Sequence, residues 1–256
     1  MNKFCFIIDN EKKNNKLKKS LFNKYKNYSS KACKVIIVLG GDGFMLQTLK
    51  KYQKYNKPFY GINRGSFGFL MNKYKTSNIN KIVSESKLLT ILPLQMKVLT
   101  KSGKFFTAIA INEVSLLRQT KQTASLQVKN GKKILINKLI CDGIIISTPA
   151  GSTAYNLSVR GPILSLNSKE LAITPISPFR PRRWEGKVVP SSSLIQVNNL
   201  DTKKRSVSVV ADNVEVRNIK NVKIKINNLI KFKLLYDKNN SLTKKIKLEQ
   251  NIKIKN

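Results

Sequence analysis

A carboxylate stands inside a glycine-rich turn in the first quarter of the chain, in the run Gly40-Gly41-Asp42-Gly43. Glycines carry no Cβ, so the backbone N–H groups of such a turn and the positive end of a following helix can approach a phosphate closely. A carboxylate at that point is repelled by phosphate unless it binds a cation or accepts a proton. Taken alone, these four residues fit a phosphate-handling turn and a structural turn with a solvated aspartate about equally well.

The turn matches neither of two familiar phosphate-binding patterns. Leu46 stands where a dinucleotide fingerprint has its third glycine, and the Walker-type GxxxxGK[ST] pattern is absent. Neither pattern therefore explains the turn.

A second candidate site lies in the stretch from Cys141 to Ser158, which reads CDGIIISTPAGSTAYNLS. An apolar strand there leads into a glycine-bearing turn that is rich in hydroxyl groups. Ser152, Thr153 and Tyr155 offer donors suited to ribose, adenine or phosphate oxygens. Taken alone, the stretch is better explained as a structural turn closed by serine and threonine hydroxyls.

The chain contains no histidine, so acid–base chemistry falls first to its 13 carboxylates. Four of them lie beside glycines or apolar strands, namely Asp42, Glu113, Asp142 and Asp212.

The three cysteines are widely spaced and form no CxxC pair, so we predict neither a disulfide framework nor a zinc site. No metal ligands are predicted.

The formal net charge is +36, which raises the possibility of nucleic-acid binding. The lysines are spread along the whole chain, however, and no RNA-binding pattern with interleaved aromatic residues is present. We therefore favour solvated charged faces over a nucleic-acid surface, although the charge would still attract small polyanions.

The apolar run Phe4–Ile8 is too short for a signal peptide, and no stretch approaches a membrane span, so we expect a soluble, cytoplasmic protein.

The glycine turn is flanked by a predicted buried strand, Val35–Leu39, and a predicted helix that reaches Tyr52. Further strands are predicted at Phe4–Asp9 and Pro58–Ile62, with a possible helix in the Lys-rich segment before Tyr28. This alternation predicts a Rossmann-like parallel α/β sheet, in which ligands bind at the carboxyl ends of the strands. The turns Gly40–Gly43 and Gly61–Gly68 both lie at such ends.

From about Leu92 the pattern changes to short alternating runs joined by turn signals, which predicts antiparallel β structure. Asn130-Gly131 is a strong two-residue hairpin signal, and the stretch Ser206–Val216 alternates on both sides of Asp212-Asn213. We predict an α/β phosphate-binding domain at residues 1–92, to which residues 235–256 return, and an antiparallel β domain at residues 93–234. A helix is predicted at Ser241–Gln250.

Taken together, these stretches resemble the NAD kinase family from about Val35 to Val216. Gly40–Gly43 is similar to the family's GGDG signature, and Gly61–Leu70 to its second glycine loop. Asn112-Glu113 matches its NE pair, and the segment from Asp142 to Tyr155 matches its longest signature. Asp212-Asn213 stands where many relatives have Asp-Gly, and Phe44 where many have Thr. The run SPFRPRRW, Ser177–Trp184, resembles the alphaproteobacterial branch.

The resemblance implies transfer of the terminal phosphoryl group of ATP to the 2′-hydroxyl of the adenosine ribose of NAD, giving NADP. It implies Asp42 as the proton acceptor, backbone amides of Gly40, Gly41 and Gly43 around phosphates, and Mg²⁺ carried with ATP. Asn112 and Glu113 would bind the adenosine ribose, and Asp142 the nicotinamide end. The rest of the NAD-binding set implied by the resemblance is Thr153, Ala154, Tyr155, Asn156, Leu157 and Ser158, together with Asp42 and Gly43.

The resemblance also implies a homodimer or homotetramer that acts on NAD and ATP, and it leaves polyphosphate open as an alternative donor. The nearest alternative function is a lipid or sugar kinase built on the same GGDG turn, which would leave the Ser147–Tyr155 signature without a purpose. A second alternative is a nucleic-acid binder without catalytic activity. We expect neither a specific nucleic acid nor a membrane as a partner.

Overall fold

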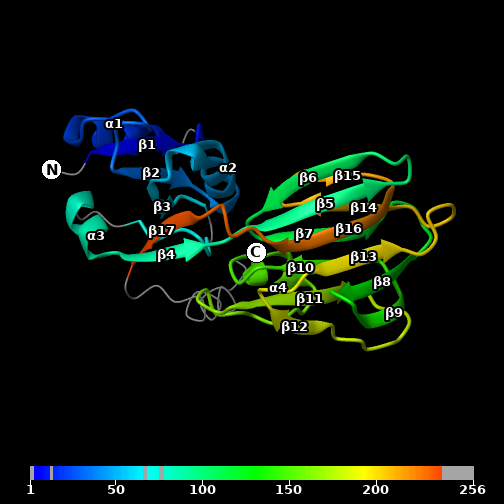
Figure 1. The fold of residues 1–256 in the computed structure, drawn as a ribbon. Helices are drawn as coiled ribbons and strands as arrows, with labels where there is room; N and C mark the ends of the chain where they lie inside the picture. The colour runs from blue at the N-terminus through cyan, green and yellow to red at the C-terminus, as the bar shows by residue number, and fades with distance from the viewer. Residues whose placement is uncertain (1–2, 12–13, 66–67, 75–77, 238–256) are drawn as a thin grey trace, which may run out of the picture. The chain divides into compact units, whose positions relative to one another are not determined.

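The computed structural model describes residues 3–11, 14–65, 68–74 and 78–237 of the 256-residue chain. The chain divides into two compact units (Figure 1). Of the described residues, the first unit contains those up to Ile91 together with residues 230–237, and the second contains Leu92–Leu229. None of the described helices is both long and apolar enough to cross a membrane.

The first unit is built on a five-stranded sheet in the order β1-β2-β3-β17-β4. Its first four strands are parallel, whereas β4 runs antiparallel to β17. The bounds of its elements are β1 Phe4–Ile8, α1 Asn15–Lys24, β2 Val35–Gly40, α2 Asp42–Tyr52, the 3₁₀ helix η2 Gln53–Tyr55, β3 Pro58–Asn63, α3 Ile79–Glu85, β4 Lys87–Ile91 and β17 Phe232–Tyr236.

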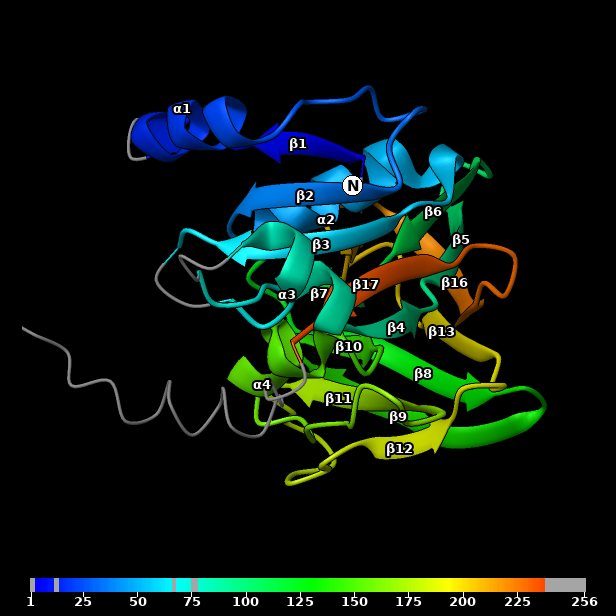
Figure 2. The ribbon, with the colours of Figure 1, turned by 90° about the vertical axis from the view of Figure 1, so that its left-hand side faces the viewer.

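Apolar residues cover both faces of this sheet. All six residues of β2 are buried, as expected for a central parallel strand. On one face, Ile37 packs in a cluster with Leu21 of α1 and Val83 of α3. Figure 2 shows α3 in front of the sheet and α2 behind it, and the buried Met45 lies against Gly61 of β3, where an added Cβ would come within 2.5 Å of its methyl group. The two faces together hold β2 and β3 side by side, so the turns that follow them are neighbours.

The strand β17 lies in the first unit, whereas the β domain predicted from the sequence extends to residue 234. Lys233 to Leu235 pair with Pro58 to Tyr60 of β3, and Phe232 and Leu234 are buried there. The alternating pattern correctly predicts a strand, but a period of two does not specify which sheet the strand joins. The helix predicted at Ser241–Gln250 lies outside the described residues.

The second unit consists of two six-stranded sheets in which every pair is antiparallel. The strand orders are β12-β11-β10-β7-β14-β15 and β6-β5-β16-β13-β8-β9. The bounds are β5 Leu94–Thr100, β6 Phe105–Ala110, β7 Glu113–Arg118, β8 Ala124–Asn130, β9 Lys133–Cys141, β10 Gly143–Ser147, η3 Gly151–Thr153, α4 Tyr155–Ser158, β11 Glu170–Ile176, β12 Lys187–Pro190, β13 Ile195–Asn199, β14 Val207–Ala211, β15 Val214–Val216 and β16 Ile219–Ile226.

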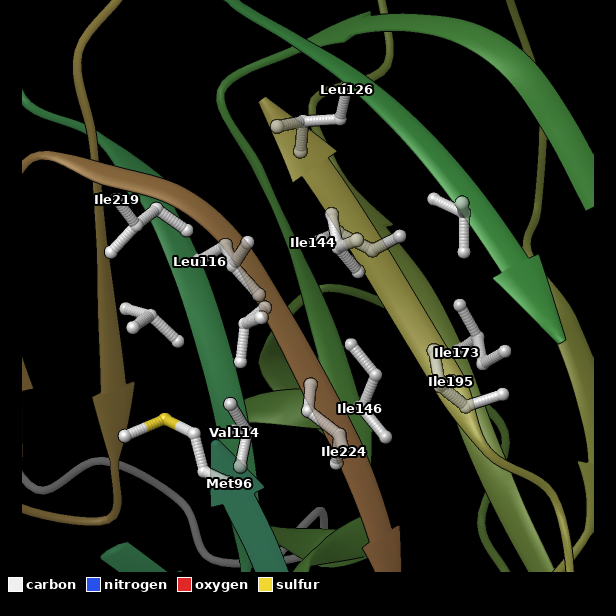
Figure 3. Packing of buried hydrophobic residues seen from close by; sticks show 14 of the residues in the cluster. Met96, Val114, Leu116, Leu126, Ile144, Ile146, Ile173, Ile195, Ile219 and Ile224 are labelled. Carbon is white, nitrogen blue, oxygen red and sulfur yellow. The ribbon is translucent and has the colours of Figure 1, made fainter. Parts of the chain in front are cut away.

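The two sheets of this unit enclose a single apolar core (Figure 3). Val114, Ile144 and Ile173 come from one sheet, Met96 and Ile195 from the other, and all five side chains are fully buried. Burying each such side chain stabilises the fold by about 1.5–3 kcal/mol before entropy losses. The core therefore gives a rigid support to the loops at the strand ends. The predicted combination of an α/β unit and an antiparallel β unit is confirmed.

The hairpin between β8 and β9 is one residue away from its predicted position. Asn130 pairs with Lys133, so the two loop residues are Gly131 and Lys132 rather than Asn130 and Gly131. Gly131 has φ +57°, and a hairpin turn with glycine at its first position needs this conformation. The glycine thus decides the register, and the asparagine ends the strand.

Candidate active site

The predicted glycine turn joins the end of β2 to the start of α2. Gly41 precedes the helix in an extended conformation, with φ −101° and ψ −179°, and Asp42 is the first helical residue. A Cβ on Gly40 would lie 2.7 Å from Cδ1 of Phe44, whereas a Cβ on Gly41 or Gly43 would meet no atom within 4 Å. Gly40 is therefore required by packing within the turn, and Gly41 and Gly43 border open space that a ligand can enter.

The Asp42 carboxylate connects this turn to the second glycine loop. Its Oδ2 accepts a hydrogen bond from the backbone N–H of Phe69 at 2.7 Å, and its Oδ1 accepts one from Leu70 at 3.1 Å. These two hydrogen bonds fix the direction in which the Asp42 carboxylate points.

The second loop is fixed at its start by Asn63, the last residue of β3. The Asn63 Oδ1 accepts the backbone N–H of Gly65 at 3.0 Å, and the N–H of Arg64 donates to the Gly40 carbonyl at 2.9 Å. These contacts keep the two loops side by side at the carboxyl ends of β2 and β3. This is the edge at which ligands bind in open α/β sheets.

Tyr236 of β17 supports the same loop from a distant part of the chain. Its hydroxyl donates to the Phe69 carbonyl. Burial, with a smaller contribution from the charge of Asp42, raises the pKa of Tyr236 well above its ordinary value of about 10. The phenol therefore stays protonated and acts as a donor at any physiological pH.

In the second unit, the backbone of the segment Ile111–Glu113 is hydrogen-bonded to two residues from other parts of the chain. The N–H groups of Ile111 and Asn112 donate to the Asp212 carboxylate at 2.8 and 2.9 Å, and that of Glu113 donates at 3.4 Å. The Ile111 carbonyl accepts the Thr148 hydroxyl at 2.7 Å, and the Asn112 carbonyl accepts the Thr148 N–H at 2.9 Å. The backbone polar groups of the predicted NE pair are therefore used within the fold.

The side chains of the NE pair are not used in this way. Asn112 Oδ1 and Glu113 Oε2 are buried and have no hydrogen-bond partner among the described residues. Burial, followed by the negative charge of Asp212, raises the pKa of Glu113 to about 7. Unpaired buried polar atoms cost free energy, so their presence is typical of a site whose partner is a ligand.

The long signature packs directly against the NE pair. An added Cβ on Gly151 would lie 2.1 Å from the Asn112 carbonyl oxygen, so only glycine fits between the turn and that backbone. Gly151 N–H also donates to the Thr148 hydroxyl at 3.1 Å. The structure therefore brings Asn112, Glu113 and the η3 turn, which contains Thr153, into one place.

Two residues of the stretch from Cys141 to Ser158 have structural roles. The Asn156 amide donates to the carbonyls of Ser152 and Pro162 and accepts the Thr174 hydroxyl at 2.7 Å. The Ser152 hydroxyl is fully buried and is bonded to the Pro149 carbonyl and the Leu164 N–H. Both side chains hold η3 and α4 in place. The remaining predicted positions are distributed over η3 and α4, with Thr153 buried, Ala154, Tyr155 and Leu157 half-buried, and Ser158 exposed.

Asp142 lies at the opposite end of β10 from the NE pair. Ser147 is the partner of Glu113 in the sheet, whereas Gly143 is the partner of Leu117. A five-residue strand is about 16 Å long, so the Asp142 side chain does not join this cluster. It instead forms an ion pair with Arg118, with 2.6 Å between Nε and Oδ1.

The described residues contain no group of three histidine, cysteine, aspartate or glutamate side chains arranged to hold a metal ion.

A glycine turn that borders open space at the end of a parallel strand places this chain among the phosphate-binding α/β proteins. Comparison with known families gives the narrower assignment. Residues 6–86 match the ATP-NAD kinase N-terminal domain, and residues 111–231 match the ATP-NAD kinase C-terminal domain. The chain belongs to the NAD kinase family.

Several curated relatives are similar over almost the whole chain. The NAD kinase of Zymomonas mobilis is 45% identical over 251 residues, which are 97% of both chains. The NAD kinase of Brucella suis is 42% identical over 96% of this chain and 95% of the relative. Both organisms are alphaproteobacteria, so the predicted branch is confirmed.

Solved structures support the fold independently of close sequence similarity. An NAD kinase from Archaeoglobus fulgidus in complex with ATP superposes with a TM-score of 0.76 at 20% identity, covering 96% of this chain and 98% of that one. A yeast NADH kinase complexed with NADH gives a TM-score of 0.74 at 22% identity, covering 87% and 68% of the two chains.

Sequence reasoning missed four contributors to these sites: Thr148, Tyr236 and the amides of Phe69 and Leu70. Thr148 lies inside the recognised signature, so its position was a usable signal. The sequence singles out Asp212 as a carboxylate beside an apolar strand but predicts no role for it. Its backbone partners are about 100 residues away, and local patterns do not reveal such contacts.

Proposed function

We propose that this protein transfers the terminal phosphoryl group of ATP to the 2′-hydroxyl of the adenosine ribose of NAD, producing NADP, with Asp42 accepting the hydroxyl proton. The observation that carries this proposal is the Asp42 carboxylate, which is held by two backbone amides at the point where two glycine loops meet. A proton acceptor must be within hydrogen-bond reach of the hydroxyl and fixed in direction.

The turn around Asp42 would hold the donor. Phosphoryl transfer needs alignment and charge stabilisation more than covalent help. We assign the N–H groups of Gly41 and Gly43 to phosphate oxygens, because the space beside both residues is open. Mg²⁺, bound to the phosphates of ATP, would neutralise part of their charge.

The NE pair would hold the acceptor. Asn112 Oδ1 and Glu113 Oε2 are acceptors without a partner in the described part of the chain, and ribose hydroxyls are donors that can bond to them. We assign these two side chains to the adenosine ribose, and Thr153, Ala154, Tyr155 and Ser158 to the adenine and the nucleotide body. Asn156 and Leu157 belong to the same segment, where the Asn156 side chain supports the others.

Asp142 has a separate part in the proposal. It lies far from the NE pair within one chain, and the family resemblance assigns it to the nicotinamide end. In a homo-oligomer, Asp142 of one subunit can serve NAD bound to another. The homo-oligomeric state and the cytoplasmic location remain predictions.

Purified protein, incubated with Mg²⁺, ATP and NAD, should produce NADP, which an NADP-specific dehydrogenase detects. Parallel reactions with diacylglycerol and with fructose 6-phosphate test the lipid-kinase and sugar-kinase alternatives. Folded protein that phosphorylates either of these acceptors and not NAD would contradict the proposal. Replacing ATP with polyphosphate, and NAD with NADH, defines the donor and the acceptor further.

A further inference from the structure

Asp212 occupies the turn between β14 and β15 in a conformation that side chains rarely adopt. Its φ is +52°, in the left-handed region, which Asn, Asp and Gly tolerate best. The turn alone would be served as well by asparagine or glycine. The conformation of the turn therefore does not explain why residue 212 is an aspartate.

The reason lies in the hydrogen bonds of its two oxygens. Oδ2 accepts the N–H of Ile111, and Oδ1 accepts the N–H of Asn112, both within 2.9 Å. The backbone N–H of Asp212 also donates to the Glu113 carbonyl at 3.2 Å. Asparagine could not replace the carboxylate, because its NH₂ group would face one of these N–H donors.

The segment Ile111–Glu113 is thus fixed from two sides. Asp212 accepts hydrogen bonds from its N–H groups, and Thr148 donates hydrogen bonds to the carbonyls of Ile111 and Asn112. Among the residues that the structure describes, Oδ1 of Asn112 and Oε2 of Glu113 remain without a hydrogen-bond partner. Fixing the backbone fixes the direction in which these two side chains point.

Resting on the proposed function, we propose that Asp212 is a positioning residue for NAD: its carboxylate aligns the NE segment so that the Asn112 and Glu113 side chains face the adenosine ribose. Asp212 touches no substrate in this role. It acts through the backbone of the segment and through its charge on Glu113.

Because Asp212 is charged, its proposed positioning role can be tested through the pH dependence of NAD binding. Asp212 is the charged group, among the described residues, that adds to burial in raising the pKa of Glu113 to about 7. If ionised Glu113 accepts ribose hydroxyls, NAD affinity rises with pH through about 7. Removing the charge of Asp212 lowers the pKa of Glu113 and moves that rise to lower pH.

The test compares the wild type with Asp212→Asn in steady-state kinetics and in NAD binding between pH 5.5 and 8.5. We expect KM for NAD to increase by about tenfold, from the lost alignment, with kcat changed by less than about threefold. The midpoint of the pH dependence of NAD binding should move to lower pH. Asp212→Gly guards against misfolding, because glycine adopts the left-handed turn without strain, and it should show the same changes.

Asp201→Asn is the matched control. Asp201 is also a turn aspartate that accepts a backbone N–H, from Lys204 at 3.0 Å, but its partners lie within its own turn and the neighbouring Arg205. This variant should leave KM and the pH midpoint unchanged. If the wild type makes NADP and both Asp212 variants bind NAD normally, the positioning role is wrong and the proposed function stands. If the wild type makes no NADP, the proposed function and the inference both fail.

Discussion

At the scale of single residues, two carboxylates have opposite environments. Asp42 receives two backbone N–H groups, which fix the direction of its carboxylate. Glu113 is half-buried beside Asp212, and its Oε2 has no hydrogen-bond partner among the described residues, so its pKa is raised to about 7 by burial and by the charge of Asp212. The first carboxylate is therefore fixed in direction by the backbone, and the second changes charge near neutral pH.

The raised pKa of Glu113 predicts a pH-dependent stability. Its ordinary pKa is 4.5 and its folded value is about 7, so between these pH values the folded state holds more protons than the unfolded state. The contribution of Glu113 to the free energy of unfolding is then lost as pH rises from about 4.5 to 7. Glu113→Gln removes the titration, so its Tm relative to the wild type should increase between pH 5 and pH 8. Glu215→Gln, at an exposed position of β15, is the control; equal pH dependence of all three proteins would contradict the assigned burial cost.

Removing the Glu113 side chain tests its binding role separately from its stability effect. Glu113→Ala should raise KM for NAD by about tenfold, because a ribose hydroxyl loses its acceptor, with a smaller change in kcat. Calorimetric NAD binding without ATP measures the same loss directly. Unchanged KM and kcat would remove Glu113 from the NAD site.

At the scale of elements, the adjacent residues Gly40 and Gly41 of the glycine turn have different environments. Gly40 must be glycine because Phe44 packs against it, whereas Gly41 borders open space with an ordinary negative φ. Packing and ligand binding can therefore be separated by one substitution at each position.

Gly41→Ala should fold with nearly unchanged Tm and raise KM for ATP, because the added methyl group occupies the space assigned to a phosphate. Gly40→Ala should instead lower Tm, because its Cβ would lie 2.7 Å from the Phe44 ring. Thermal unfolding and ATP kinetics on the two variants make the comparison. Normal ATP kinetics in Gly41→Ala would show that no phosphate lies against this residue.

The elements also show where sequence patterns stop being informative. The apolar run after Lys34 predicts β2, and the glycine turn with the following periodicity predicts α2, because both signals are local. The membership of β17 in the first sheet depends on which edge is available for pairing, and a strand's own residues do not encode that. The same holds for sites: Glu113 was predicted, whereas the Asp212 and Thr148 contacts that fix its backbone arise only from packing.

At the scale of the whole molecule, the +36 charge acts on every anionic substrate. Long-range attraction of ATP and NAD should be screened by salt, because the Debye length falls from about 10 Å at 0.1 M to about 3 Å at 1 M.

KM for ATP should therefore rise by about three- to tenfold between 0.05 and 0.5 M KCl, with the smaller charge of NAD giving a weaker effect. Sucrose at matched osmolality is the control. Duplex DNA binding that weakens steeply over the same range, combined with no effect of salt on ATP, would instead favour a nucleic-acid surface.

The central claim is that Asp42 accepts the proton of the ribose hydroxyl, and kcat of Asp42→Asn tests it most directly. Tyr236→Phe is the control, because it removes another support of the Phe69 loop and leaves the carboxylate in place. We predict that Asp42→Asn lowers kcat by about 10² or more while NAD affinity stays within a few fold, and that Tyr236→Phe changes kcat by less than about tenfold. Unchanged turnover in Asp42→Asn, or an equal loss in both variants, would contradict the account.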